Sequence, residues 1–147
     1  MPNTIRLHRV LCASPHRSYR AFIDPDAKVK WLRPNGFTGK VHYLDARVGG
    51  TYKMSFTNFT TGHSHSWQGE YIELTPNTCI RYTDRLDDSN LPGTMQVTDE
   101  LKQVTCGTEM NITQEGIPYV IPTEACYMGW QGSLVLLAKL VEAEIPD

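Results

Sequence analysis

The C-terminal segment from Thr123 to Glu144 constrains the fold more than any other part of the sequence. Pro122 ends the preceding segment, Thr123 is a favourable helix N-cap, and no proline follows until Pro146. Apolar side chains recur at steps of three and four, which predicts a helix of about 22 residues, roughly 33 Å long. Such a helix cannot bury its apolar face alone, so the rest of the chain must supply a broad surface. The residues of that face are Tyr127, Trp130, Leu134, Leu137 and Val141.

A strand and two short helices are expected before the middle of the chain. Apolar and polar residues alternate over Thr4–Leu11, which predicts a strand. Ser14 followed by proline begins a helix, because serine caps the first turn and proline at the first helical position loses no hydrogen bond. Asp24 precedes another proline, which ends this helix, and Asp24 is expected to cap a second one running to about Leu32. The segment 33–36 is expected to be a turn.

The central part of the sequence predicts an antiparallel sheet. Short segments rich in Val, Thr, Tyr and Phe are separated by turn residues, and links of hairpin length imply antiparallel neighbours. The sequence therefore predicts an α+β fold, in which a curved antiparallel sheet of about six to seven strands wraps around the long helix, with residues 1–147 as one domain. The expected central strands are Phe37–Arg47, Thr51–Asn58, Ser64–Leu74, Cys79–Asp84, Met95–Gln103 and Thr108–Gln114.

Several short motifs occur in an order that is typical of one protein family. Val48–Met54 carries two glycines before a strand, Trp67–Pro76 is a glycine-acidic strand ending in proline, and Gly107–Gly116 follows later. Together with the two short helices, these motifs cover nearly the whole chain and resemble the AHSA-like branch of the START-like, or SRPBCC, superfamily. The resemblance implies the helix-grip fold. Members often have a second tryptophan after the position of Trp31, where this chain has Leu32, so a smaller aromatic platform is expected.

The composition indicates a globular protein and argues against several classes of function. Hydrophobic residues make up 40% and charged residues 20% of the sequence, which is typical of folded soluble proteins. A net charge of -2 gives no general reason to bind nucleic acid or an anionic membrane. The sequence shows neither a signal-peptide pattern nor an apolar run long enough to span a membrane. Four widely spaced cysteines without a C-x-x-C pair favour a cytoplasmic protein with reduced thiols.

The helix-grip fold permits a cavity between the long helix and the sheet, and in the wider superfamily that cavity holds apolar ligands. Gly129 and Gly132 flank Trp130, which indicates either close approach of the sheet or room for a ligand. The alternative is that the aromatic side chains simply fill the core. The candidate cavity-lining residues are Trp31, Tyr52, Met54, Phe56, Trp67, Trp130 and Leu134.

The remaining polar candidates give no catalytic or metal site. Arg81 is expected to point outward to solvent, and His63 and His65 share a strand face but lack a third metal ligand. Glu70 and Glu73, three apart on a strand, are expected to face opposite sides and so to make a poor acid–base pair. No nucleophile motif, phosphate-binding loop or dinucleotide fingerprint occurs. The sequence therefore predicts no catalytic residue, no cofactor and no metal.

Three functions stay open on the sequence alone. The favoured one is a non-catalytic, stress-related protein that binds a small apolar or amphipathic molecule between the long helix and the sheet. The resemblance also implies a co-chaperone-like domain that stimulates a heat-shock-protein ATPase, although it does not extend to the additional N-terminal domain of the true activators. The third is a cyclase or lyase, which requires a buried ionisable residue that opens into the cavity. A homodimer would be compatible with an exposed edge strand.

Overall fold

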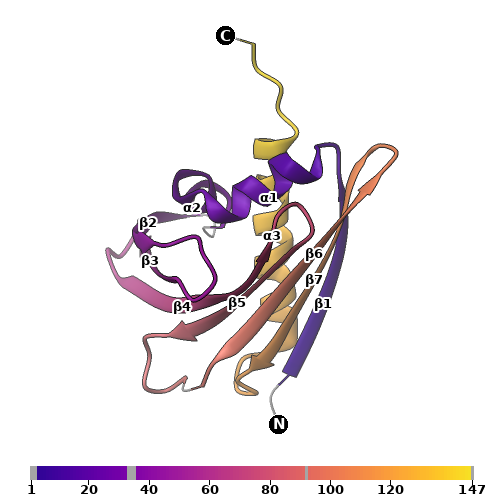
Figure 1. Ribbon diagram of the computed structural model, residues 1–147. Helices are drawn as coiled ribbons and strands as arrows, with labels where there is room; N and C mark the ends of the chain where they lie inside the picture. Colours follow the sequence, from indigo (N-terminus) through magenta and orange to yellow (C-terminus); the bar gives the residue numbers. More distant parts are fainter. Residues whose placement is uncertain (1–2, 33–35, 92, 147) are drawn as a thin grey trace.

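Seven antiparallel strands form one curved sheet, and a long helix lies along its concave face (Figure 1). The computed structural model describes residues 3–32, 36–91 and 93–146. The α+β fold with two short helices after the first strand agrees with the prediction. The elements are β1 (Asn3–Leu11), α1 (Pro15–Ile23), α2 (Pro25–Leu32), β2 (Phe37–Leu44), β3 (Thr51–Asn58), β4 (Ser64–Thr75), β5 (Cys79–Leu86), β6 (Met95–Val104), β7 (Gly107–Ile117) and α3 (Thr123–Val141).

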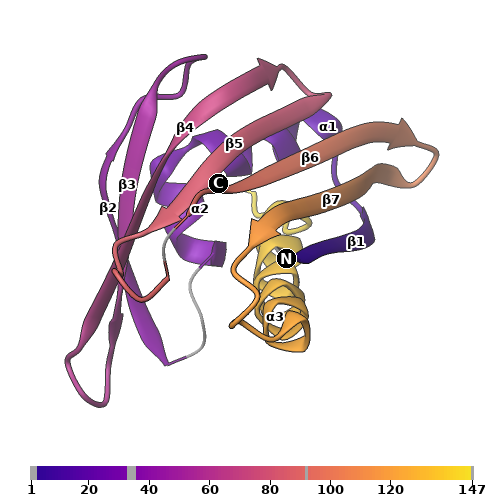
Figure 2. The same cartoon turned by 90° about the horizontal axis from the view of Figure 1, so that it is seen from below.

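The strand order is β1-β7-β6-β5-β4-β3-β2, so each strand from β2 to β7 pairs with its neighbours in sequence. β1 lies at the edge of the sheet opposite β2 and pairs with β7. Seen from below, the sheet bends around the helices, with α3 beside β1 and β7, and with α2 between α3 and the strands β2 and β3 (Figure 2). The inner face of the curved sheet is therefore turned toward the helices (Figure 2).

Local sequence signals explain why the two short helices begin where they do. The Ser14 hydroxyl accepts a hydrogen bond of 3.1 Å from the Arg17 N–H at the start of α1. The Asp24 carboxylate accepts hydrogen bonds from the N–H groups of Asp26 at 2.9 Å and Ala27 at 3.2 Å at the start of α2. Both predicted caps are therefore confirmed.

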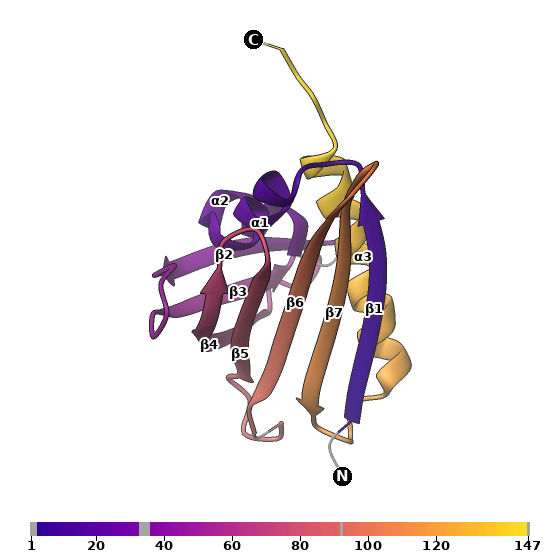
Figure 3. The ribbon, with the colours of Figure 1, turned by 45° about the vertical axis from the view of Figure 1, so that its right-hand side comes forward.

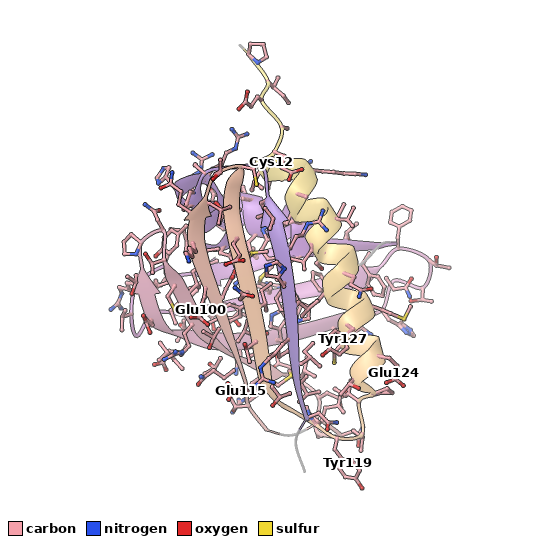
Figure 4. The ribbon with its side chains drawn as sticks, turned by 90° about the vertical axis from the view of Figure 1, so that its right-hand side faces the viewer. Cys12, Glu100, Glu115, Tyr119, Glu124 and Tyr127 are labelled. Atoms are coloured by element: carbon pink, nitrogen blue, oxygen red, sulfur yellow. The ribbon has the colours of Figure 1, made fainter. Side chains whose placement is uncertain are left out.

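The apolar core lies between α3, α1 and the inner face of the sheet. Leu134, Leu137 and Val141 of α3 are buried, and they belong to one hydrophobic cluster with side chains from the strands and α1. Figure 3 shows α3 behind β1, β7 and β6, with its C-terminal half nearest α1. At that end the Cys12 N–H donates a hydrogen bond of 2.8 Å to the Glu142 carboxylate, and Figure 4 shows Cys12 beside the end of the helix.

Several element boundaries differ from the sequence prediction, among them both ends of α3 and the end of β2. Thr123 does not cap α3: Pro122 occupies the N-cap position in an extended conformation, without a side-chain hydrogen bond. The helix ends at Val141, so it has 19 residues and is shorter than expected. β2 ends at Leu44, because the Asp45 N–H already bonds to the Thr51 carbonyl at 3.0 Å and closes the turn. Most of the turn predicted for 33–36 lies outside the described residues.

Candidate functional site

A pocket of about 340 Å³ lies between α3 and the sheet, with α2 at one end. Its walls are mostly apolar and aromatic, and it is open to solvent on one side. His65 and Gly129 are exposed at its mouth, whereas Lys28 and Tyr82 are buried at its floor. The other lining residues are Leu32, Phe56, Ser66, Trp67, Asp84, Leu86, Met95, Gln114, Cys126, Trp130 and Ser133.

The floor of the pocket carries a buried amine. Lys28 on α2 is only 1% exposed, and its Nζ has no hydrogen-bond partner among the described residues. Three tyrosine rings surround this nitrogen, with centroids at 4.2 Å for Tyr52, 4.9 Å for Tyr82 and 5.5 Å for Tyr71. The negative faces of these rings favour a cation. An ammonium without a hydrogen-bond partner in such a place is costly, and Lys28 is also one of the residues that line the pocket.

The carboxyl group of Asp84 is the polar neighbour of this amine. Asp84 lines the pocket, and the Tyr52 hydroxyl forms a hydrogen bond with its carboxylate. The same hydroxyl lies 2.6 Å from the Thr83 carbonyl oxygen. A tyrosine hydroxyl has one proton, so it donates to only one of these acceptors at a time, and a protonated Asp84 can donate in return.

Gly69 makes the Tyr52–Asp84 contact possible. It pairs with Tyr52 across β3 and β4, and a Cβ added to it would lie 2.7 Å from the Tyr52 hydroxyl oxygen and 1.8 Å from the Thr83 carbonyl oxygen. Any larger residue would therefore occupy the space through which the tyrosine reaches β5.

Burial moves the pKa values of both ionisable groups toward neutrality. Desolvation lowers the pKa of Lys28 to about 8, and the negative charge of Asp84 limits this fall. Desolvation raises the pKa of Asp84 to about 6, against the hydrogen bond from Tyr52 and the positive charge of Lys28. The pKa values of Tyr52 and Tyr82 rise well above 10.0, first because of burial and then because of Asp84, so both phenols stay neutral.

A second polar pair holds the aromatic wall in place. The Trp130 indole N–H donates a hydrogen bond of 2.8 Å to the side-chain oxygen of Gln114 on β7. The Gln114 amide in turn donates to the Met95 sulfur at 3.3 Å. These two contacts fix the indole ring at the side of the pocket, and they leave its ring face available to an apolar ligand.

Of the seven cavity residues named from the sequence, three line the pocket and four do not. Phe56, Trp67 and Trp130 line the pocket. Trp31 and Met54 are fully buried in the core, and the Trp31 indole N–H donates to the Ala21 carbonyl at 2.9 Å. The Tyr52 ring faces Lys28 beneath the pocket, and Leu134 is a buried core residue on α3.

The two glycines beside Trp130 mark open space. A Cβ on Gly129 or on Gly132 would meet nothing within 4 Å, so close approach of the sheet is wrong as an explanation for them. Gly129 lies at the mouth of the pocket, whereas Gly132 is absent from its lining.

The other polar predictions have mixed outcomes. Arg81 points outward as expected, with its guanidinium 3.5 Å from the Glu73 carboxylate. His65 lies at the pocket mouth, and the described residues contain no group of three or more His, Cys, Asp or Glu side chains that could hold a metal. The prediction that Glu70 and Glu73 face opposite sides is wrong, because a register shift after Tyr71 turns Glu73 to the outer face.

Sequence reasoning missed Lys28 and Asp84, although a signal for each was present. Lys28 lies three residues before the buried Trp31, so the two side chains share a face of α2. Asp84 continues the inward alternation of Ile80 and Tyr82 on β5. In both cases the signal was a charged residue at a position that the periodicity assigns to the inner face.

The curved sheet, the long C-terminal helix and the pocket between them define a START-like helix-grip protein. The chain belongs to the family of activator of Hsp90 ATPase homolog 1-like proteins, which matches residues 12–142. No curated protein matches the chain. None of the described helices is long and apolar enough to cross a membrane.

Solved structures share this fold over nearly the full length of the chain. Protein CV1439 from Chromobacterium violaceum is 58% identical, with a TM-score of 0.95 over 98% of this chain and 100% of that chain. A protein from Rhodobacter sphaeroides is 18% identical, with a TM-score of 0.85 over 97% of each chain. A protein from Rhizobium leguminosarum is 24% identical, with a TM-score of 0.79 over 98% of this chain and 97% of that chain. The last two likenesses concern the fold alone.

Proposed function

We propose that this protein binds a small amphipathic molecule in the pocket between α3 and the sheet. The apolar part of the ligand packs against Phe56, Trp67 and Trp130, and a hydrogen-bond acceptor at its other end meets Lys28. The observation that carries this proposal is the fully buried Lys28 amine, which finds no hydrogen-bond partner among the described residues at the floor of an apolar pocket. A ligand acceptor would satisfy this donor and reduce the cost of its burial.

The size of the pocket restricts the ligand to a small molecule. Its volume of about 340 Å³ lies near the lower end of the range in which proteins bind small ligands, roughly 300–1,000 Å³. The mouth at His65 and Gly129 gives a route of entry. An amphipathic shape follows from the lining, because the ionisable groups Lys28 and Asp84 lie at one end and aromatic rings form the walls.

A homologous series of linear alcohols tests the proposal. We expect affinity to rise from hexanol to octanol as more apolar area is buried, and to level off when the pocket is full. Trp67 and Trp130 line the pocket, so their fluorescence reports binding, and native mass spectrometry gives the stoichiometry. Lys28→Met should weaken octanol binding, whereas Lys30→Met, an exposed position on the same helix, should leave it unchanged. Absence of both a fluorescence change and a complex for every alcohol would refute the proposal.

The family description supplies a second candidate, stimulation of a heat-shock-protein ATPase. The two functions are separable, because ligand binding depends on the buried Lys28, whereas docking to a large partner depends on surface residues. ATPase stimulation that is equal for the native protein and for Lys28→Met would support the second candidate. Stimulation that is lost in Lys28→Met would indicate that the ATPase activity of the partner depends on the ligand pocket.

A further inference from the structure

The surroundings of Lys28 select the kind of acceptor that a ligand would bring. Asp84 is close enough for its charge to act on the amine, so the pair already balances one positive with one negative charge. A ligand with a charge of its own would leave this buried site unbalanced, which is costly in a region of low dielectric. A neutral acceptor such as a carbonyl oxygen keeps the balance.

We propose that Lys28 captures an apolar aldehyde or ketone as an imine in this pocket, a reaction that rests on the binding function proposed above. Three features of the geometry support it. The amine has no hydrogen-bond partner among the described residues, Lys28 lines the pocket, and the Asp84 carboxyl group lines the same pocket. A lysine amine in an apolar site with an acid–base neighbour is the arrangement that Schiff-base chemistry requires.

The reaction balances with the groups present. The reaction starts from the minor protonation state of the pair, in which Lys28 is a neutral amine and Asp84 is a carboxylic acid. The nitrogen lone pair then forms a bond to the carbonyl carbon, the carbonyl π electrons move to oxygen, and Asp84 relays a proton from nitrogen to oxygen. Asp84 next protonates the hydroxyl group, the C–O bond breaks, water leaves, and the nitrogen lone pair forms the C=N bond. The sum is one carbonyl compound and one ammonium converted to one iminium ion and one water, with no oxidant or reductant.

The product suits the site that holds the ammonium. The iminium ion keeps the positive charge at the position of the Lys28 nitrogen, where the rings of Tyr52 and Tyr82 lie within 5 Å. These ring faces and the regenerated Asp84 carboxylate stabilise a cation there. The alkyl group of the former aldehyde then lies along the apolar wall of the pocket.

The pKa values support a reaction near neutral pH. The groups that face Lys28 are Tyr52 from β3, Tyr71 from β4, and Tyr82 and Asp84 from β5. With a pKa of about 8, Lys28 holds on the order of a hundredfold more neutral amine at pH 7 than an ordinary lysine does. With a pKa of about 6, Asp84 can both give and accept a proton in the same range. The remaining titratable lining groups are His65 and Cys126, on β4 and α3.

Reductive trapping tests the proposal on the full chain. The protein is incubated with octanal and cyanoborohydride at pH 7, and each lysine is examined for N-octylation by peptide mass spectrometry. We expect the initial rate at Lys28 to exceed that at the exposed Lys30 by roughly a hundredfold, because burial lowers the pKa of Lys28 to about 8. Octanol should compete at Lys28 and not at Lys30. Lys28→Arg, which keeps a cation but cannot form the imine, should abolish the fast labelling.

The outcomes separate this inference from the binding function. Octanol binding without preferential labelling of Lys28 would overturn imine formation and leave the proposed function standing. Failure of octanol and octanal to bind at all would overturn both. Because the decisive comparison is made between two lysines of the native protein, a folding defect in the arginine variant would not obscure it.

Discussion

At the scale of single residues, the inward-facing carboxyl groups of Asp84 and Asp99 affect the stability of the folded protein. Asp84 has a pKa of about 6 in the folded protein against 3.8 for an ordinary aspartate. Between these values the folded chain holds a proton that the unfolded chain has released. The contribution of Asp84 to stability is therefore fully present below about pH 4 and is lost as the pH rises through about 6.

Replacing Asp84 by asparagine should remove this pH dependence. We expect the slope of the free energy of unfolding against pH to become less negative between pH 4 and 6 in Asp84→Asn than in the native protein. Urea unfolding at half-unit steps of pH measures it. Glu115→Gln, at an exposed position of β7 labelled in Figure 4, is the control and should keep the native slope. Identical slopes in the native protein and in Asp84→Asn would show that the carboxyl titrates normally.

Asp99 presents a different case, because nothing in the described part of the chain contacts its carboxyl oxygens through a hydrogen bond. It is fully buried on β6 between Ile80 and Ile112, and burial raises its pKa well above 3.8. We expect Asp99→Val to raise the free energy of unfolding at pH 7 by about 1–3 kcal/mol, the cost of an unpartnered buried polar group. Chemical denaturation measures the change.

The matched control for this substitution is Asn111→Val on β7, an exposed position that should change stability by no more than about 0.5 kcal/mol. A loss of stability in Asp99→Val alone would mean that the carboxyl group has a partner in solution, such as a buried water.

At the scale of the elements, periodicity and caps carried most of the sequence prediction. Ser14, Asp24 and their prolines placed α1 and α2, and the alternation around Tyr52 placed β3 with both of its ends. The pattern failed at the register shift after Tyr71, because a bulge adds a residue without a recognisable sequence signal. It also failed for Lys28, because a lysine on a short helix resembles any solvated charge until its neighbours in space are known.

The two kinds of glycine in this fold make opposite predictions for alanine substitution. Gly132→Ala in α3 should stabilise the protein by up to about 1 kcal/mol, because its Cβ meets nothing and alanine is the better helix former. Gly69→Ala in β4 should destabilise it by about 1–3 kcal/mol or more, since the backbone oxygen of Thr83 cannot move away. Thermal unfolding of both variants checks the pair. Equal effects at the two positions would contradict the packing described around Tyr52.

At the scale of the whole molecule, α3 runs through two regions of different packing. Around Leu137 and Val141 it is enclosed by the core, whereas around Trp130 it forms one wall of the open pocket. The sequence predicted the helix and its apolar face from one periodic pattern. The glycines beside Trp130 also indicated the half of the helix where a pocket could open. Whether that pocket is open or filled could not be predicted, because it depends on how far the sheet curves and on where α2 crosses it.

Alanine substitutions in the two halves of α3 should therefore have different consequences. Leu137 is 0% exposed, so Leu137→Ala should cost about 2–5 kcal/mol of stability and leave the affinity of the folded protein for octanol nearly unchanged. Trp130→Ala should cost less, because the ring already borders open space, and should weaken octanol binding by roughly tenfold, equivalent to about 1.4 kcal/mol. Calorimetric titration and urea unfolding of both variants give the two quantities. If Trp130→Ala lost stability alone and kept its affinity, this end of α3 would be core, and the ligand would have to bind elsewhere.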